Sequence, residues 1–287
     1  MLIWIVGSRG LLGTAFAKLL KERGAAFSAT SRKECDITSW EAVQHKGKKI
    51  VPTHIVNCAA YTQVDLAERE EEAASLVNAT GPYHLALIAN ELHARLIHLS
   101  TDYLFDGAMR RPYREMDACA PLSGYGRSKW EGEKRIEKTA NKWCIVRTSW
   151  LFGPGGGNFL SSVLSRMQRE DEVQVVSDQV NRPTFAFDLA EALFSLLDAQ
   201  GIYHFANGHP MTRFEMARDL FEEGNKRGMR LNCKRVLPIS MALFEQAARR
   251  PPYSALDTSK VTEFLGKPPR SWKEILEEYL CSQNACL

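Results

Sequence analysis

The chain has 287 residues, 45% of them hydrophobic and 25% charged, a composition that fits an ordinary globular protein and argues against disorder or a collagen-like repeat. Lys and Arg number 37 and Asp and Glu 34, so the net charge of +3 is too close to neutral to favour nucleic acid as a partner. No stretch approaches the roughly 20 apolar residues of a membrane span and no signal peptide is recognisable, so we expect a cytoplasmic protein with no membrane partner. The cysteines are scattered, odd in number and without a C-x-x-C pair, which indicates reduced thiols rather than disulfides or a zinc site: Cys35, Cys58, Cys119, Cys144, Cys233, Cys281 and Cys286.

Short apolar segments alternate with helical patterns through the first half of the chain. The expected strands are Leu2–Val6, Phe27–Thr30, His54–Asn57, Arg95–Leu99 and Trp143–Arg147. The expected helices are Leu11–Arg23, Ser39–His45, Glu68–Asn78, Pro82–Leu92 and Pro121–Thr139. Strands that alternate with helices are typical of parallel β-α-β units. The sequence therefore predicts an α/β protein with a doubly wound, Rossmann-type parallel sheet.

The pattern changes after Trp150. The elements expected there are a loop at Gly153–Gly157, helices at Asn158–Arg169, Ala186–Leu197, Arg213–Lys226, Ser259–Leu265 and Trp272–Leu280, and strands at Val173–Val176 and Ile202–Phe205. This mixture predicts a smaller, mixed α/β C-terminal substrate domain. We expect residues 1–150 and about 173–200 in the dinucleotide-binding domain, and about 151–172 with 201–287 in the substrate domain.

A glycine motif lies directly between the first expected strand and the first expected helix. It reads Gly7-x-x-Gly10-x-x-Gly13. Such glycines allow a tight turn and close approach of the backbone to a pyrophosphate, which the helix N-terminus then binds. The motif predicts a dinucleotide site whose loop also includes Arg9, Leu11 and Leu12.

The residues after the second strand bear on the choice of cofactor. An acid at this point usually binds the ribose hydroxyls of NAD, but the strand here ends in Thr30, followed by Ser31 and Arg32. Arg32, helped by Ser31, Arg9 or Lys33, can pair with a 2′-phosphate, which favours NADPH while leaving NADH possible. A solvated surface arginine is the alternative reading. Asp36 could reach the adenine or cap the next helix.

Tyr125 and Lys129 stand four residues apart near the start of an expected helix, so their side chains share one face. A lysine ammonium near a phenol lowers the phenol pKa, which suits proton exchange with a substrate oxygen. Ser100 and Thr101 end the fourth expected strand, at the sheet edge where ligands bind in open parallel sheets. A hydroxyl there can bond the same substrate oxygen.

Further motifs extend over nearly the whole chain. They are V-D-x-A-E from Val64, S-T-D-Y-x-F-D-G from Ser100, P-L-x-x-Y-G-x-x-K from Pro121, R-T-S-W from Arg147, D-Q from Asp178 and R-P-x-x-S from Arg250. With the glycine loop, this set resembles the extended short-chain dehydrogenases and, among them, the dTDP-4-dehydrorhamnose reductase family.

The resemblance implies roles for matching residues. Thr101, Tyr125 and Lys129 would form the catalytic trio, and Tyr125 and Lys129 would also contact the cofactor. Further cofactor contacts would come from Ile37, Ala59, Ala60 and Tyr61. The substrate site would include Val64, Asp102, Tyr103, Trp150 and Asn158. Arg250, expected at the end of a helix before two prolines, would meet a diphosphate, with Arg249 and Arg182 as competitors.

The implied activity is the NADPH-dependent reduction of dTDP-4-dehydro-L-rhamnose to dTDP-L-rhamnose, a polysaccharide precursor. Two alternatives stay open. One is another nucleotide-sugar epimerase or dehydratase, although Tyr103 stands where dehydratases of this superfamily carry an acid. The other is a non-catalytic NADP-binding subunit like the regulatory subunit of methionine adenosyltransferase. Some family members hold magnesium through acids of the first helix at a dimer contact. Thr14–Ala17 carries none, so we expect no metal and a monomer or weak homodimer.

Overall fold

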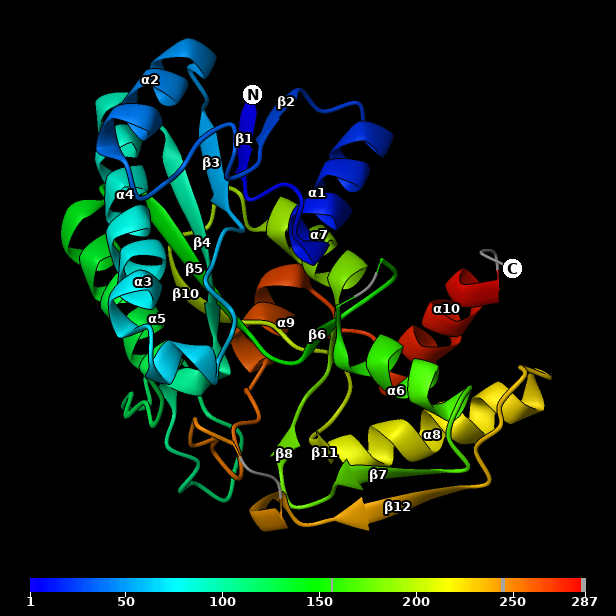
Figure 1. The fold of residues 1–287 in the computed structure, drawn as a ribbon. Coiled ribbons are helices and arrows are strands. Elements are labelled where there is room, and N and C mark those ends of the chain that lie inside the picture. Colours follow the sequence, from blue (N-terminus) through cyan, green and yellow to red (C-terminus); the bar gives the residue numbers. More distant parts are fainter. Residues whose placement is uncertain (156, 244–245, 285–287) are drawn as a thin grey trace.

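Six parallel strands form the central sheet of the computed structural model, which describes residues 1–155, 157–243 and 246–284 (Figure 1). In sheet order they are β10 (Gly201–His204), β5 (Trp143–Thr148), β4 (Arg95–Thr101), β3 (His54–Asn57), β1 (Ile3–Val6) and β2 (Phe27–Thr30). The chain steps from β1 to β2 on one side and then to β3 on the other. This reversal is the switch point at which doubly wound sheets bind ligands. The predicted Rossmann-type fold class is confirmed.

Helices cover both faces of this sheet (Figure 1). On one face lie α1 (Leu11–Glu22) and α7 (Ala186–Ser195); on the other lie α2 (Trp40–Ile50), α4 (Gly81–Glu91) and α5 (Gly124–Thr139). In β1, Ile3 and Ile5 pack with α1 and α7, whereas Trp4 and Val6 pack with α2 and α4. A strand buried on both sides has no polar face, which explains its continuous apolar sequence.

Asn78 fixes the helical connection between β3 and β4. The connection runs through η1 (Leu66–Glu68), α3 (Glu71–Ser75) and the π-helical turn η2 (Leu76–Thr80) into α4. Within η2 the buried Asn78 accepts from Tyr61 N at 2.9 Å and donates to Ser128 Oγ at 3.0 Å. The helix predicted at Glu68–Asn78 is therefore divided. The wide turn directs Asn78 inward, where it joins the loop after β3 to α5.

The rest of the chain forms a second unit around its own apolar core. Its strand pairs are β6 (Leu151–Phe152) with β9 (Thr184–Phe185), β7 (Glu172–Val176) with β12 (Arg235–Ile239), and β8 (Val180–Asn181) with β11 (Met211–Thr212). Its helices are α6 (Phe159–Met167), α8 (Arg213–Lys226) and α10 (Trp272–Asn284). Three short elements complete the described chain: η3 (Asp102–Leu104), η4 (Met241–Leu243) and α9 (Ser259–Leu265).

Strand pairing corrects the expected division at two places. β10, which we expected in the substrate domain, is the edge strand of the six-stranded sheet and pairs with β5. β7, expected in the dinucleotide-binding domain, pairs instead with β12, a strand that the sequence analysis did not predict. The other expected boundaries between the dinucleotide-binding domain and the substrate domain remain a proposal. Gly156 of the expected glycine loop and Cys286 lie outside the described residues, and the six described cysteines are free thiols.

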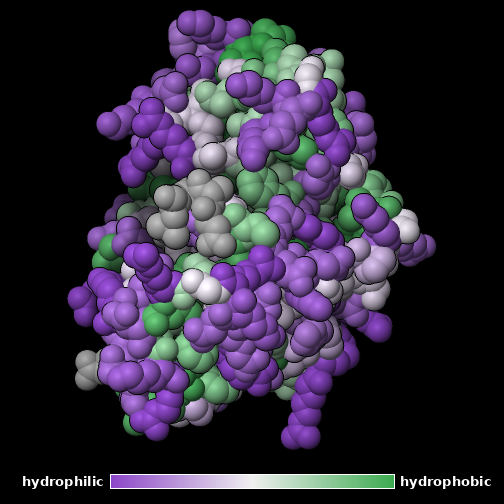
Figure 2. Space-filling model, turned by 90° about the vertical axis from the view of Figure 1, so that its right-hand side faces the viewer, coloured by the Kyte–Doolittle hydropathy of each residue, from purple (hydrophilic) through white to green (hydrophobic). Residues whose placement is uncertain are grey.

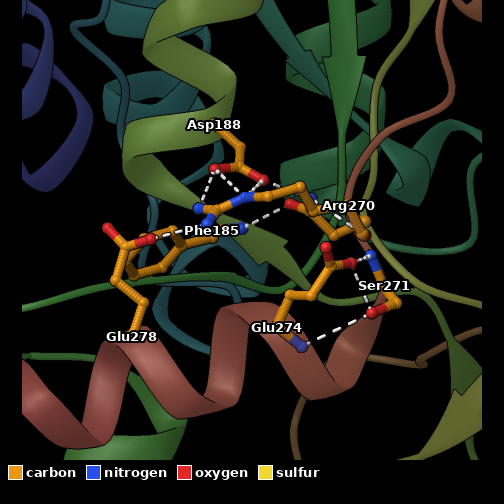
Figure 3. A network of polar contacts seen from close by, with 7 residues as sticks. Phe185, Asp188, Arg270, Ser271, Glu274 and Glu278 are labelled. Atoms are coloured by element: carbon orange, nitrogen blue, oxygen red, sulfur yellow. Dashed lines mark hydrogen bonds and ion pairs between the residues drawn. The ribbon is translucent and has the colours of Figure 1, made fainter.

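Arg270 joins the second unit to the sheet (Figure 3). Its Nε lies 3.0 Å from both carboxylate oxygens of Asp188 in α7, and its Nη1 lies 2.6 Å from Glu278 in α10. The guanidinium also faces the Phe185 ring, 5.8 Å from its centroid. Asp188 in turn accepts from Asn207 at 2.6 Å. One cation therefore ties a sheet-covering helix to the C-terminal helix.

Among the described residues, no helix is both long and apolar enough to cross a bilayer. On the face shown in Figure 2, apolar side chains form small patches between hydrophilic ones.

We predict that Arg270→Met lowers the free energy of unfolding by about 1–3 kcal/mol, because the largely buried Asp188 carboxylate loses its charged partner and keeps only the hydrogen bond from Asn207. Denaturant unfolding measures this loss. The matched control is Arg235→Met, which breaks an ion pair whose two side chains are 66% and 42% exposed, so its cost should be under about 1 kcal/mol. Equal losses in the two variants would contradict a joining role for Arg270.

Candidate active site

The glycine loop is pressed against the loop that follows β3. Gly7 has a φ of +80°, and a Cβ at this position would lie 2.6 Å from Ala59 N. A Cβ on Gly13 would lie 2.4 Å from Gly7 O. Neither position accepts a side chain, so the backbone is left open to a ligand at the N-terminus of α1.

Most of the predicted cofactor residues line one pocket of about 500 Å³. They are Gly7, Arg9, Gly10, Ser31, Arg32, Asp36, Ile37, Ala59, Ala60 and Tyr61. Leu11, Leu12 and Gly13 form the first turn of α1 instead, with Leu12 buried in the core. Asp36 does not cap α2, since Ser39 is the cap; its carboxylate binds Thr38. The pocket has the loop and helix terminus that a dinucleotide needs.

An acid does stand beside the end of β2, although sequence analysis did not identify it. Glu34 Oε2 accepts from the backbone N and the Oγ of Ser31, at 2.8 and 2.7 Å. These hydrogen bonds lower the pKa of Glu34. Arg32 is 81% exposed at its side chain and lies 3.5 Å from Asp36. The Ser-x-x-Glu spacing, which is that of a capping box, was the available signal for Glu34.

Tyr125 and Thr101 meet at the carboxyl end of β4. Ser123 caps α5 by accepting from Gly126 N at 3.1 Å, which places Tyr125 in the first helical turn. Its phenol lies beside the Thr101 hydroxyl, and Thr101 donates to Asp102 at 3.2 Å. Burial raises the pKa of Tyr125, so the phenol keeps its proton. The neighbouring Ser100 hydroxyl is buried without a hydrogen-bond partner in the described structure.

Lys129 contradicts one expectation. Its Nζ does not lie against the phenol: it donates to Leu99 O at 2.6 Å and contacts His98 Nε2 at 3.1 Å. The prediction that Lys129 lowers the pKa of Tyr125 is therefore wrong for this arrangement. The buried β4 backbone offers the lysine a carbonyl and a ring nitrogen that it can reach from the same face of α5.

Asp102 supports the site from beneath. It is only 2% exposed, and its Oδ2 accepts from Asn181 at 2.6 Å and from Ser254 at 2.7 Å. Both donors belong to the second unit. Asp102 therefore forms a bridge between the two units, and its expected contact with substrate stays a prediction. Burial raises the pKa of Asp102 to about 6, although these hydrogen bonds oppose the shift.

Arg250 connects the C-terminal part of the chain to Asp65 and Tyr103 in the site. Its Nη1 and Nη2 lie 3.0 and 2.6 Å from the two carboxylate oxygens of Asp65, and its guanidinium lies close to Tyr103. The Tyr103 ring meets Tyr125 edge-on, with centroids 5.6 Å apart. Arg250 lies in an irregular segment rather than at the end of a helix. Together with Arg249 it lines a cavity of about 700 Å³.

Val64 lines a different cavity, of about 940 Å³, together with Asp65. Asn158 caps α6, accepting from Ser161 N at 3.1 Å and donating to Gly153 O at 2.9 Å. Arg182 is held by backbone carbonyls, among them Leu256 O at 3.1 Å, which removes it as a competitor of Arg250. The roles assigned to Val64 and Asn158 in sugar binding stay predictions.

Arg213 is a cation of this region that sequence analysis missed. At the start of α8, its guanidinium lies 4.6 Å from the ring centroid of Trp150 and 4.7 Å from that of Phe159. Trp150 has a φ of +41°, a strained value that clusters at functional sites. Burial raises the pKa of Tyr103, and the positive charge of Arg213 opposes part of this shift. Nothing in the local sequence marks Arg213, because the contact depends on how α8 packs on the β5–β6 loop.

No group of three or more His, Cys, Asp or Glu side chains that could hold a metal occurs within the described ranges.

Residues 1–284 match the family model of the RmlD substrate binding domain. The chain belongs to this family. It is 39% identical to a dTDP-4-dehydrorhamnose reductase of Streptomyces griseus over 96% of this chain and 92% of that protein. It is 36% identical to the spore coat polysaccharide biosynthesis protein SpsK of Bacillus subtilis, over 99% and 98% of the two chains. The resemblance inferred from the motifs is confirmed.

Solved structures place the family fold over the whole chain. A dTDP-4-dehydrorhamnose reductase of Bacillus anthracis, determined in complex with NADP, superposes with a TM-score of 0.91 at 35% identity and 98% coverage of both chains. A UDP-glucose 4-epimerase of Thermus thermophilus has a TM-score of 0.83 at 19% identity, which shows a shared fold alone.

Asp102 makes stability depend on pH. Its folded pKa of about 6 lies above the ordinary 3.8, so its contribution to stability is complete below about pH 4 and is lost as the pH rises through about 6. We predict that the difference in unfolding free energy between wild type and Asp102→Asn falls by on the order of 2–3 kcal/mol from pH 4 to pH 7. Denaturant melts at several pH values measure it. Parallel pH profiles for the two proteins would refute the assignment.

Proposed function

We propose that this protein reduces dTDP-4-dehydro-L-rhamnose to dTDP-L-rhamnose with NADPH. The observation that carries the proposal is the proton-bearing phenol of Tyr125 next to Thr101 at the carboxyl end of β4, the same sheet edge at which the glycine loop follows β1. Full-length relatives named dTDP-4-dehydrorhamnose reductase support the choice of substrate.

The residues present fit the cofactor. The backbone at Gly7 and Gly10 and the N-terminus of α1 would hold the diphosphate. Ser31, Arg32 and Arg9 would face the 2′-phosphate at the end of β2, with Glu34 close by. When bound, NADPH supplies a hydride to the substrate carbonyl carbon.

The chain's own groups handle the proton. The C4 oxygen of the sugar gains negative charge as it is reduced, and the phenol of Tyr125 donates its proton there. Thr101 orients that phenol and is in turn held by Asp102. Tyr103, Trp150 and Arg213 would border the sugar, and Arg250 with Arg213 would face its diphosphate.

Two other functions make different predictions. A non-catalytic NADP-binding subunit would bind NADPH but would not consume it with dTDP-4-dehydro-L-rhamnose. An epimerase or dehydratase would convert a nucleotide sugar without net oxidation of NADPH. A relative from Streptomyces niveus, 35% identical, is named dTDP-4-keto-6-deoxy-D-glucose reductase, so the C4 configuration of the product must also be determined.

We predict that Tyr125→Phe lowers kcat by about 10²–10⁴-fold, since only the proton donor is removed. NADPH affinity should stay within about twofold, because the phenyl ring keeps its packing against Tyr103. Stopped-flow NADPH oxidation and fluorescence titration separate the two effects. Wild-type turnover in this variant would show that Tyr125 is not the donor.

We predict that Arg250→Ala weakens binding of the nucleotide sugar by about 1.5–3 kcal/mol, the usual contribution of a hydrogen bond to a charged group. NADPH affinity should be unchanged. Arg249→Ala is the matched control, because both side chains line the same cavity but only Arg250 reaches Asp65 and Tyr103. An unchanged KM for the nucleotide sugar would indicate that Arg213, rather than Arg250, binds the diphosphate.

A further inference from the structure

A chain of buried and partly buried hydrogen bonds runs from Ala59, in the loop after β3, to Lys129 and the β4 backbone. Ala59 N donates to Asn57 Oδ1 at 3.0 Å, and Asn57 Nδ2 lies 3.0 Å from His98 Nδ1. His98 Nε2 lies 3.1 Å from Lys129 Nζ, which donates to Leu99 O at 2.6 Å. Asn57 and His98 are fully buried and Lys129 is 1% exposed. The two central bonds, Asn57–His98 and His98–Lys129, are therefore shielded from solvent.

The direction of this chain is set at its first bond. A backbone N–H can only donate, so the atom of Asn57 that faces Ala59 must be the amide oxygen. The amide NH₂ of Asn57 then faces His98 Nδ1, and that nitrogen must accept. A proton on Nδ1 would set two donors against each other. His98 is therefore neutral, with its single ring proton on Nε2.

That proton decides the state of the lysine. His98 Nε2–H points at Lys129 Nζ, and a lysine nitrogen accepts a hydrogen bond only as the uncharged amine, because an ammonium has no lone pair. The hydrogens of the amine remain available for Leu99 O. Each bond in the chain is then satisfied once, in one direction, from Ala59 to Leu99.

Other charged groups near Lys129 do not reverse this. Burial lowers the pKa of Lys129 to about 8, while Glu133 on α5 and Cys58 after β3 act to raise it. Burial alone would leave the ammonium predominant at neutral pH, so the uncharged amine rests on the direction of the hydrogen bonds. Glu133 is neutralised by Arg147 on β5, at 2.7 Å. Burial holds the pKa of His98 well below its usual range. Tyr125, on the same helix, keeps its proton and is neutral.

We propose that Asn57 and His98 are positioning residues that hold Lys129 as an uncharged amine in the cofactor-free enzyme, so that NADPH binding through this lysine takes up one proton from solvent. The proton-uptake part rests on the proposed function. The part concerning the free enzyme rests on the buried chain alone, and neither Asn57 nor His98 needs to touch substrate or cofactor.

The first test is the tautomer of His98 in the cofactor-free wild type, read from proton–nitrogen NMR of isotope-labelled histidine. His98→Gln identifies the signal by removing it. We expect a protonated Nε2 and a bare Nδ1. A proton on Nδ1 overturns the proposal, whether or not the protein reduces nucleotide sugars. The expected tautomer without any NADPH consumption would instead contradict the proposed function.

The second test reverses the chain with Asn57→Asp. The carboxylate still accepts from Ala59 N but now also accepts from His98 Nδ1–H, which leaves Nε2 to accept from an ammonium. The pH above which NADPH affinity declines should rise by about one to three units, and Lys129→Met should abolish this dependence. Asn90→Asp, at a partly buried asparagine remote from the site, should leave the profile unchanged. A uniform loss of affinity at every pH in Asn57→Asp would indicate a merely structural role and overturn the proposal.

Discussion

The carboxylate of Asp102 is the contact on which the arrangement of the site depends. It lies at the end of β4, where it accepts hydrogen bonds from Asn181 and Ser254, 79 and 152 residues away in sequence. A buried carboxylate needs such donors, because desolvation would otherwise expel or neutralise it. The second unit is thus fixed on the sheet at the residue next to Thr101. Any movement of that unit would displace Asp102, which directly follows Thr101, the residue beside the catalytic phenol of Tyr125.

Arg250 and Arg270 strengthen the same junction in different ways. Arg270 pairs with Asp188 and Glu278 far from the phenol and gives the junction stability. Arg250 pairs with Asp65 inside the site, with the Asp65 side chain 48% exposed. The oxygens of a diphosphate can bind a guanidinium as well as the oxygens of a carboxylate can. The bridge at Arg250 can therefore exchange its partner for a ligand, which the enclosed bridge at Asp102 cannot.

The sequence predicted the elements with a clear period and the residues with a fixed spacing. The sheet strands, the helices at Arg213–Lys226 and Ser259–Leu265, the glycine loop and the Tyr125–Thr101 pair all depend on local pattern. Two-residue strands such as β8 and β11 are too short to show alternation, and β12 is half exposed and interrupted by Pro238. The Arg250–Asp65 pair and the stacking of Arg213 on Trp150 join residues far apart in the chain. Local sequence carries no signal of either contact.

The protonation states of the site follow from burial and hydrogen-bond direction, which residue identity alone does not give. Y-x-x-x-K suggested an ammonium that lowers the pKa of the phenol, yet the structure ties the lysine to β4 and buries the phenol. A reduction requires this buried, protonated state of the phenol. Tyr125 must still hold its proton when the sugar oxygen becomes negative. In the arrangement we propose, Lys129 becomes cationic only as the cofactor arrives, so the buried β4 backbone carries no uncompensated ammonium before then.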